Sequence, residues 1–397
     1  MAWRSKAEKI KRWANIWFSQ FRVIGLKNQR PADDNSDGVA VIKMDAIGDF
    51  LIWLDSASQY RKIYPNHEIT LICNTACEEL AKHTGFFDHI IAVHSRRFEA
   101  DNRYKKEVLE LLEKQSYQTL LQPAYSRTVD MDILAYHIPA KEKIGFAADE
   151  SRENLSRYLT FRRIRQRLDA AYDKLLPSGP EHLMELERNA RFIRGLGQEF
   201  QAGYPCLPVS GVPSAMIPEK PYAVIFPGAS SQKKMWPIER FAEAGAYIIR
   251  EKNMDIYLCG GKEEAYLYDA FTKAMGQDTC KERVHDYFGR TTLLELAEVI
   301  RNAGLLISND TSGIHFAAAV NTKGICIFGE FAYGRFLPYC CERDCTGHEP
   351  IIVCHAGMSC AGCAHGSITK KCREHLLKTG RHLCIENVSV EQVLENI

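Results

Sequence analysis

The chain has 397 residues, of which 46% are hydrophobic and 25% charged, and its formal net charge is +1 at pH 7. This balance is typical of a folded globular protein with room for two ordinary domains, and it argues against disorder. Because the net charge is near zero, the molecule as a whole has no electrostatic reason to bind nucleic acid, and any anion site must be local.

Targeting signals are not evident in the sequence. No stretch approaches the roughly 18 apolar residues of a membrane span, and the start MAWRSKAEKIKRW lacks the apolar run of a signal peptide. We therefore predict a cytoplasmic protein. Its 14 cysteines are then expected to be free thiols or metal ligands rather than disulfides.

Residues 1–37 form a basic segment and linker that precede the predicted domains. Trp13, Ile16, Trp17 and Phe21 fall on one face of a predicted amphipathic helix, among lysines and arginines. Such a helix can lie on an anionic membrane surface, which would make the protein peripheral on the inner face of the cytoplasmic membrane. A helix docked on the protein's own surface explains the pattern equally well, so both interpretations stay open.

Residues 38–205 are predicted to form a first Rossmann-like domain. The expected elements are a strand at 39–44, a helix at 50–64, strands at 68–73, 89–93 and 118–121, and a helix at 180–196. Strand, helix and strand in this order indicate a right-handed parallel unit.

A proline-rich linker at 206–221 precedes a second predicted domain, residues 222–397. Its expected elements are strands at 222–226, 255–259, 304–308 and 324–328, and helices at 237–251, 263–275, 293–302 and 311–320. This alternation predicts an α/β fold with a doubly wound parallel sheet in each half. Two such halves would leave a cleft between the carboxyl ends of their strands, where open α/β sheets bind substrates.

The first candidate site lies where the first strand turns into the first helix, in the stretch LysMetAspAlaIleGlyAspPhe. Gly48 permits a tight turn, and Asp49 follows at the start of the helix, facing the expected cleft. A carboxylate in this position is either a reactive group or only a helix cap.

The second candidate site follows the first strand of the second domain. Gly228, Ser230, Ser231 and Lys234 offer backbone N–H groups, hydroxyls and a cation, which together suit a diphosphate. A plain loop with solvated lysines is the alternative.

The third candidate site ends the strand at 304–308. Asp310 closes the strand and Thr311 and Ser312 open a helix, whose free N–H groups would suit a phosphate. His315 stands one turn later and either orients that phosphate or is a structural histidine.

In this order and at these strand ends, the motifs resemble glycosyltransferase family nine, which includes the lipopolysaccharide core heptosyltransferases. The matched residues are Ile47, Gly48 and Asp49; Pro227, Gly228, Lys234, Trp236 and Pro237; Gly260, Gly261 and either Glu263 or Glu264; Asn309, Asp310, Thr311 and His315; and the late cysteines Cys360, Cys363, Cys372 and Cys384. The resemblance runs from about Gly38 to Ile397. One departure is Ser312 and Gly313, where the family usually shows glycine and proline.

The resemblance implies a GT-B arrangement in which the N-terminal half takes the acceptor and the C-terminal half takes a nucleotide sugar. Asp49 would be the general base of an inverting transfer. Lys234, the two serines at 230 and 231 and the helix start at Thr311 would stabilise the leaving diphosphate without a metal. Either Glu263 or Glu264 would bind the ribose hydroxyls.

Two further groups of polar residues lie in the first half. The arginine-rich run 152–167, with Arg157, Arg162 and Arg163, is either a solvated helix face or a site for an anionic glycolipid acceptor. Asp130 and Asp132 form an Asp-x-Asp, but no donor motif accompanies it, so we discount it as a metal site.

The late cysteines could hold a structural zinc or iron, because four thiolates close a tetrahedral shell and Cys360 and Cys363 have the usual spacing. Against this, Cys372 and Cys384 do not form a second Cys-x-x-Cys.

The sequence therefore predicts transfer of a sugar, heptose from ADP-heptose, to a lipopolysaccharide core or similar glycolipid. The alternatives are a heptosyltransferase that glycosylates protein, and a non-catalytic nucleotide- or metal-binding module on the same scaffold.

Overall fold

The computed structural model describes residues 27–31, 36–147, 162–180, 183–208, 217–276, 279–360, 363 and 368–397. Nearly all of the predicted amphipathic segment therefore lies outside the described residues. None of the helices in the described part of the chain is long and apolar enough to cross a membrane.

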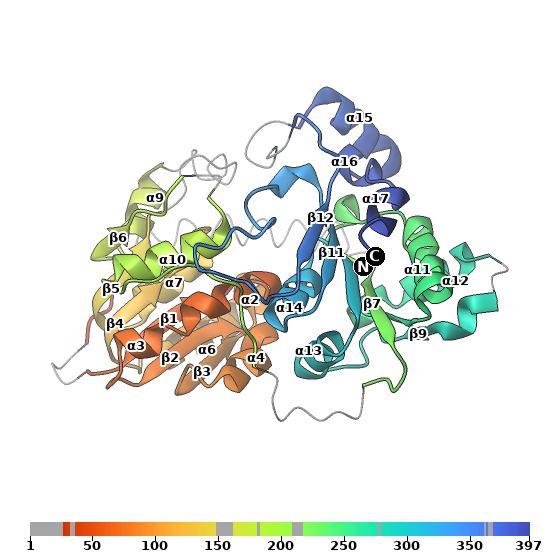
Figure 1. The fold of residues 1–397 in the computed structure, drawn as a ribbon. Coiled ribbons are helices and arrows are strands. Elements are labelled where there is room, and N and C mark those ends of the chain that lie inside the picture. Colours follow the sequence, from red (N-terminus) through yellow and green to blue (C-terminus); the bar gives the residue numbers. More distant parts are fainter. Residues whose placement is uncertain are drawn as a thin grey trace.

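The N-terminal half is built on a six-stranded parallel sheet with helices on both faces (Figure 1). Its strands are β1 (Val39–Lys43), β2 (Ile69–Asn74), β3 (His89–Val93), β4 (Tyr117–Gln122), β5 (Ala140–Phe146) and β6 (Lys174–Leu176). Its helices are α2 (Ile47–Ala57), α3 (Tyr60–Ile63), α4 (Glu78–Thr84), α5 (Ser95–Ala100), α6 (Asn102–Leu112), α7 (Val129–His137), α9 (Arg162–Asp169) and α10 (Glu185–Gly195).

The C-terminal half contains a second six-stranded parallel sheet. Its strands are β7 (Tyr222–Phe226), β8 (Asp255–Leu258), β9 (Val284–Asp286), β10 (Leu305–Asn309), β11 (Gly324–Ile327) and β12 (Ile351–Cys354). Its helices are α11 (Ile238–Lys252), α12 (Tyr266–Ala274), α13 (Leu293–Arg301), α14 (Ser312–Ala319), α15 (Lys370–Thr379), α16 (Leu383–Glu386) and α17 (Val390–Leu394).

Both sheets have the same strand order. The first runs β3-β2-β1-β4-β5-β6 and the second, read from its other edge, runs β9-β8-β7-β10-β11-β12. Each is the doubly wound Rossmann order, which reverses direction beside its first strand and leaves a crevice there. The predicted fold of two Rossmann-like units is confirmed, and the two halves repeat one topology.

The central strands form where the sequence is continuously apolar. All five residues of β1 and of β7 are buried, as expected for strands covered by helices on both faces. The helix predicted at 50–64 is instead two helices, α2 and α3, because the chain turns at Ser58. Its start is also earlier, so Gly48 and Asp49 belong to the first turn of α2.

The two halves share one apolar core. A single cluster of buried side chains includes Trp53 and Leu54 of α2, Leu80 of α4, and Phe316 and Ala317 of α14. Figure 1 shows α2 and α14 facing each other between the two sheets, with α4 and α13 beside them. Helices α2 and α14, which follow the central strands β1 and β10, therefore contact each other at the interface between the two halves. Their contact sets the position of the site described below.

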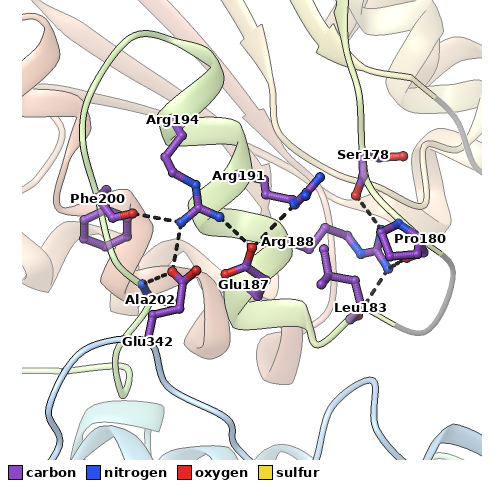
Figure 2. A network of polar contacts seen from close by, with 10 residues as sticks. All are labelled: Ser178, Pro180, Leu183, Glu187, Arg188, Arg191, Arg194, Phe200, Ala202 and Glu342. Atoms are coloured by element: carbon purple, nitrogen blue, oxygen red, sulfur yellow. Dashed lines mark hydrogen bonds and ion pairs between the residues drawn. The ribbon is translucent and has the colours of Figure 1, made fainter.

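Helix α10 is fixed by arginines that bind backbone carbonyls (Figure 2). Arg188 is buried and donates to the carbonyls of Ser178, Pro180 and Leu183. Arg194 donates to the carbonyl of Phe200, to Glu187 and to Glu342 of the C-terminal half. Because these contacts join α10 to both halves, the helix is part of the connection between them.

Candidate active site

A cavity of about 480 Å³ lies between the two halves. The N-terminal half contributes residues 46–49, at the start of α2, and the C-terminal half contributes the loops after β7, β8, β9 and β10. These loops all follow the carboxyl ends of parallel strands. The sequence predicted a cleft at this position.

Asp49 stands in the first turn of α2 and lines the cavity. Burial, together with the neighbouring carboxylate of Asp45, raises the pKa of Asp49 to about 6, although the cations of Lys43 and Lys234 oppose the rise. Lys43 is itself buried and pairs with Asp45 at 2.8 Å. Asp49 follows the N-cap residue Ala46 by three positions, and its partly exposed side chain lines the cavity.

Lys234 reaches the same cavity from the C-terminal half. It ends a single 3-10 turn, η4 (Gln232–Lys234), and its Nζ lies 3.3 Å from Oδ2 of Asp310. The ammonium also lies over the ring of Phe331, 4.4 Å from its centroid. One carboxylate and one aromatic face thus hold the cation at the cavity wall, with about a quarter of its side chain exposed (26%).

Asn309 holds the loop that carries Lys234. This fully buried side chain donates to the carbonyls of Pro227 and Gly228 and accepts from the backbone N–H of Trp236 at 2.9 Å. The three bonds tie the loop after β7 to the end of β10. The asparagine matched in the family motif is therefore a positioning residue that does not itself line the cavity.

The structure separates the two acidic candidates after β8. Glu264 lines the cavity, and its carboxylate accepts from the backbone N–H of Gly261 at 2.9 Å. Glu263 is exposed and is not among the cavity-lining residues. A Cβ at Gly228 would overlap the carboxylate of Glu264, so the absence of a side chain there leaves room for this acid. Burial raises the pKa of Glu264 above its ordinary value.

The start of α14 forms the opposite wall. Thr311 is its N-cap residue and accepts from the backbone N–H of Gly313, while Asp310, Thr311 and Ser312 line the cavity. Gly313 is not a lining residue, and a Cβ there would meet the ring of Phe226, which does line the cavity. His315 also lines the cavity, and its ring lies against Gly48 at the start of α2. The N-termini of α2 and α14 therefore meet at one site.

Several residues of the cavity were not predicted. Thr291 comes from the loop after β9, Leu293 begins α13, and Phe336 comes from the segment between β11 and β12. No motif marks these positions, and only the folded chain brings them to the cleft.

The remaining predicted residues lie elsewhere. Ser231 follows Ser230 but is not a lining residue; its carbonyl accepts from the N–H of Lys234. Arg157 lies outside the described residues, and Arg162 and Arg163 begin α9 with side chains outside the described part. In α7, Asp132 is buried beside Arg127 and Asp130 pairs with Lys105, so the Asp-x-Asp is structural.

The late cysteines do not form a recognisable metal centre. Cys372 and Cys384 are buried, while Cys360 and Cys363 are partly exposed. Among the described residues, no group of three or more histidine, cysteine or acidic side chains is placed to hold a metal ion. The structural metal therefore stays a prediction of the sequence, without support from the geometry.

The arrangement favours an anionic ligand beside a base. The N-termini of α2 and α14 and the ammonium of Lys234 supply positive potential, and the loop after β7 supplies backbone N–H groups. Asp49, in the first turn of α2, lines the same cavity and has a raised pKa. A group that departs as an anion could be stabilised here while a proton is removed nearby.

Comparison with known proteins finds similarity to one family of glycosyltransferases. Residues 179–354 match the model of glycosyltransferase family 9 (heptosyltransferase). The chain is 25% identical over 171 residues to lipooligosaccharide heptosyltransferase 2 of Campylobacter jejuni, a match that covers 43% of this chain and 47% of that protein. The chain thus spans about half the length of this curated relative.

Two longer matches agree with this. The lipopolysaccharide core heptosyltransferase OpsX of Haemophilus influenzae is 25% identical over 330 residues, covering 76% of this chain and 81% of that protein. The structure of the Escherichia coli ADP-heptose lipopolysaccharide heptosyltransferase II superimposes with a TM-score of 0.64 at 15% identity, over 90% of this chain and 97% of that one. The GT-B fold is confirmed, and these matches bear out the resemblance to glycosyltransferase family 9 that the motifs indicated.

Proposed function

We propose that the chain is an inverting glycosyltransferase that moves heptose from ADP-heptose to a lipopolysaccharide core or a similar cell-envelope glycolipid. The observation that carries this proposal is the shared cavity, in which Asp49 of one half faces Lys234 and the α14 start of the other. The similarity to proteins named as lipopolysaccharide and lipooligosaccharide heptosyltransferases supports the choice of sugar and acceptor.

In the proposed reaction the acceptor hydroxyl attacks the anomeric carbon of the sugar from the face opposite the diphosphate. Asp49 takes the proton of that hydroxyl as the new C–O bond forms. The bond from the anomeric carbon to the diphosphate breaks, its electron pair leaves on ADP, and the configuration inverts. With a pKa of about 6, Asp49 is ionised at neutral pH and is still more basic than an ordinary aspartate.

The leaving diphosphate would be stabilised by groups of the C-terminal half, without a metal. Lys234 supplies the charge, Ser230 and Gly228 line the loop, and Thr311 and Ser312 open the helix. Glu264 is the better candidate for the ribose hydroxyls, because it lines the cavity and Glu263 does not.

The proposed acceptor contacts lie in the N-terminal half. Residues 38–205 would hold the acceptor, with the arginines at 157, 162 and 163 meeting its anionic groups. The basic aromatic segment at the N-terminus would bring the enzyme to a membrane surface in a salt-dependent manner.

Mass spectrometry of reaction products tests the proposal. Purified protein is incubated with ADP-heptose, or with other nucleotide sugars, together with a lipopolysaccharide acceptor that lacks its outer core. We expect release of ADP and a glycolipid heavier by one heptose, and far less of this product from the Asp49→Asn variant. A heptose found on protein instead would favour the protein-glycosylating alternative. Binding of ADP with no transfer from any donor would favour a non-catalytic module.

A further inference from the structure

His315 and Tyr339 form a hydrogen-bonded pair at the wall of the cavity. Nδ1 of His315 lies 2.6 Å from the hydroxyl of Tyr339, which comes from the segment between β11 and β12. His315 is buried on α14, and the ring of Tyr339 packs edge-on against Tyr204 with centroids 5.1 Å apart. Tyr339 is not among the cavity-lining residues, whereas His315 is.

The geometry shows which group donates. At 2.6 Å either group can donate, according to the tautomer of the ring, but a buried phenolic O–H requires an acceptor. Within the described part of the chain, Nδ1 of His315 is also the only hydrogen-bond partner of this hydroxyl. The tyrosine O–H therefore donates and Nδ1 accepts.

An accepting Nδ1 decides where the imidazole carries its proton. Burial lowers the pKa of His315 to about 4; Asp310 opposes the shift and Lys234 adds to it. The ring is therefore neutral at pH 7 and has a single N–H group. Because Nδ1 accepts, that proton is on Nε2.

The Nε2 edge of the ring is turned toward the N-terminus of α2. A Cβ built on Gly48 would lie 3.0 Å from Cδ2 and 3.8 Å from Nε2 of His315. No hydrogen-bond partner of Nε2 is found among the described residues, and His315 lines the cavity. An N–H donor at this position is available to a ligand between the two helix starts.

We propose that Tyr339 is a positioning residue, which fixes His315 as the neutral Nε2–H tautomer so that the ring donates a hydrogen bond to the diphosphate of the donor. The identity of this ligand rests on the proposed function. The opposite tautomer would turn a lone pair toward an anion and repel it. The pair thus gives the site a neutral donor beside the cation of Lys234.

The tautomer can be measured without any ligand. Protein labelled with ¹⁵N-histidine is examined by NMR at pH 7, and the His315 signals are assigned by their loss in His315→Gln. We expect a protonated Nε2 and an unprotonated Nδ1 in the native protein, and a mixture of the two tautomers in Tyr339→Phe. A protonated Nδ1 in the native protein, or an unchanged tautomer in Tyr339→Phe, would overturn the proposal.

Tyr204→Phe is the matched control, since it removes a hydroxyl from the neighbouring ring and leaves the His315 contact intact. Calorimetry should show ADP binding about two- to fivefold more weakly to Tyr339→Phe, because only part of the protein then holds the competent tautomer. Adenosine affinity, and ADP affinity of Tyr204→Phe, should be unchanged. Equal ADP affinity for the native protein and Tyr339→Phe would overturn the diphosphate contact. If ADP does not bind native protein while the tautomer is as expected, the proposed function fails instead.

Discussion

Arg335 and Glu185 contact each other twice across the two halves of the molecule. The backbone N–H of Glu185 donates to the carbonyl of Arg335 at 2.8 Å, and Nε of Arg335 lies 3.2 Å from Oε2 of Glu185. The same guanidinium donates to Ser126 at 3.0 Å and lies over the ring of Phe336, which lines the cavity. These contacts join the start of α10 to the C-terminal half beside the cavity.

The buried carboxyl group of Glu185 predicts that the stability of the protein depends on pH. Burial, reinforced by Asp49 and Asp45, raises the pKa of Glu185 from 4.5 to about 7, although Arg188 and Lys43 oppose it. The folded protein then keeps a proton that the unfolded chain has lost, so native stability should decline between pH 4.5 and 7 and level off above. Glu185→Gln cannot titrate. The melting temperature of Glu185→Gln minus that of the native protein should therefore increase from pH 4.5 to pH 7. A difference that is the same at every pH would contradict the raised pKa of Glu185.

Strands with a continuous apolar run could be predicted from the sequence, and most strands without one could not. The central strands β1, β7 and β10 are fully buried apolar runs and were predicted. The edge strands β6, β9 and β12 were missed, whereas the edge strand β3 was predicted from its apolar run at 89–93. Strand β5 is internal, but its charged residues at 141–143 interrupt the apolar pattern.

The residues of the candidate site also fall into those that a local motif reveals and those that only the fold reveals. Asp49, Lys234 and Thr311 follow central strands, so a local motif could place them at the cleft. Phe336 and Tyr339 lie on an irregular segment whose return to the cavity depends on tertiary packing, and no local pattern could reveal it. Likewise, only the fold distinguishes Glu264 from its neighbour.

Glu264→Gln should weaken nucleotide binding through the ribose. Gln keeps the length of the side chain but loses the charge that accepts from two hydroxyls, so ADP affinity should fall by about three- to thirtyfold. An ADP analogue that lacks the ribose hydroxyls should bind the native protein and Glu264→Gln with equal affinity. This comparison completes a double-mutant cycle between the carboxylate and the hydroxyls. Glu263→Gln, the exposed neighbour, serves as the control and should bind ADP normally. An equal loss in both variants would contradict a specific role for Glu264.

Lys234→Ala should weaken ADP binding and slow turnover together. The ammonium would meet the diphosphate in both the bound donor and the transition state, and loss of a charge-assisted hydrogen bond costs about 1.5–3 kcal/mol, or roughly ten- to hundredfold in affinity. Lys233→Ala removes an exposed lysine beside it and should change little. Calorimetry with ADP and with adenosine measures the effect, which should be confined to ADP. Similar losses in the two variants would show only a general electrostatic attraction.

Asp49→Asn tests the chemical step most directly. The amide keeps the size of the side chain but cannot take a proton, so turnover should fall by about two to four powers of ten while ADP affinity changes little. In native protein kcat/KM should be full above the raised pKa and should decline as pH falls through about 6, because protonation removes the base. The residual activity of the variant should lack this acidic limb. An Asp49→Asn enzyme with nearly normal turnover, or with the same acidic limb as native protein, would show that this carboxylate belongs only to the helix start and that another group accepts the proton.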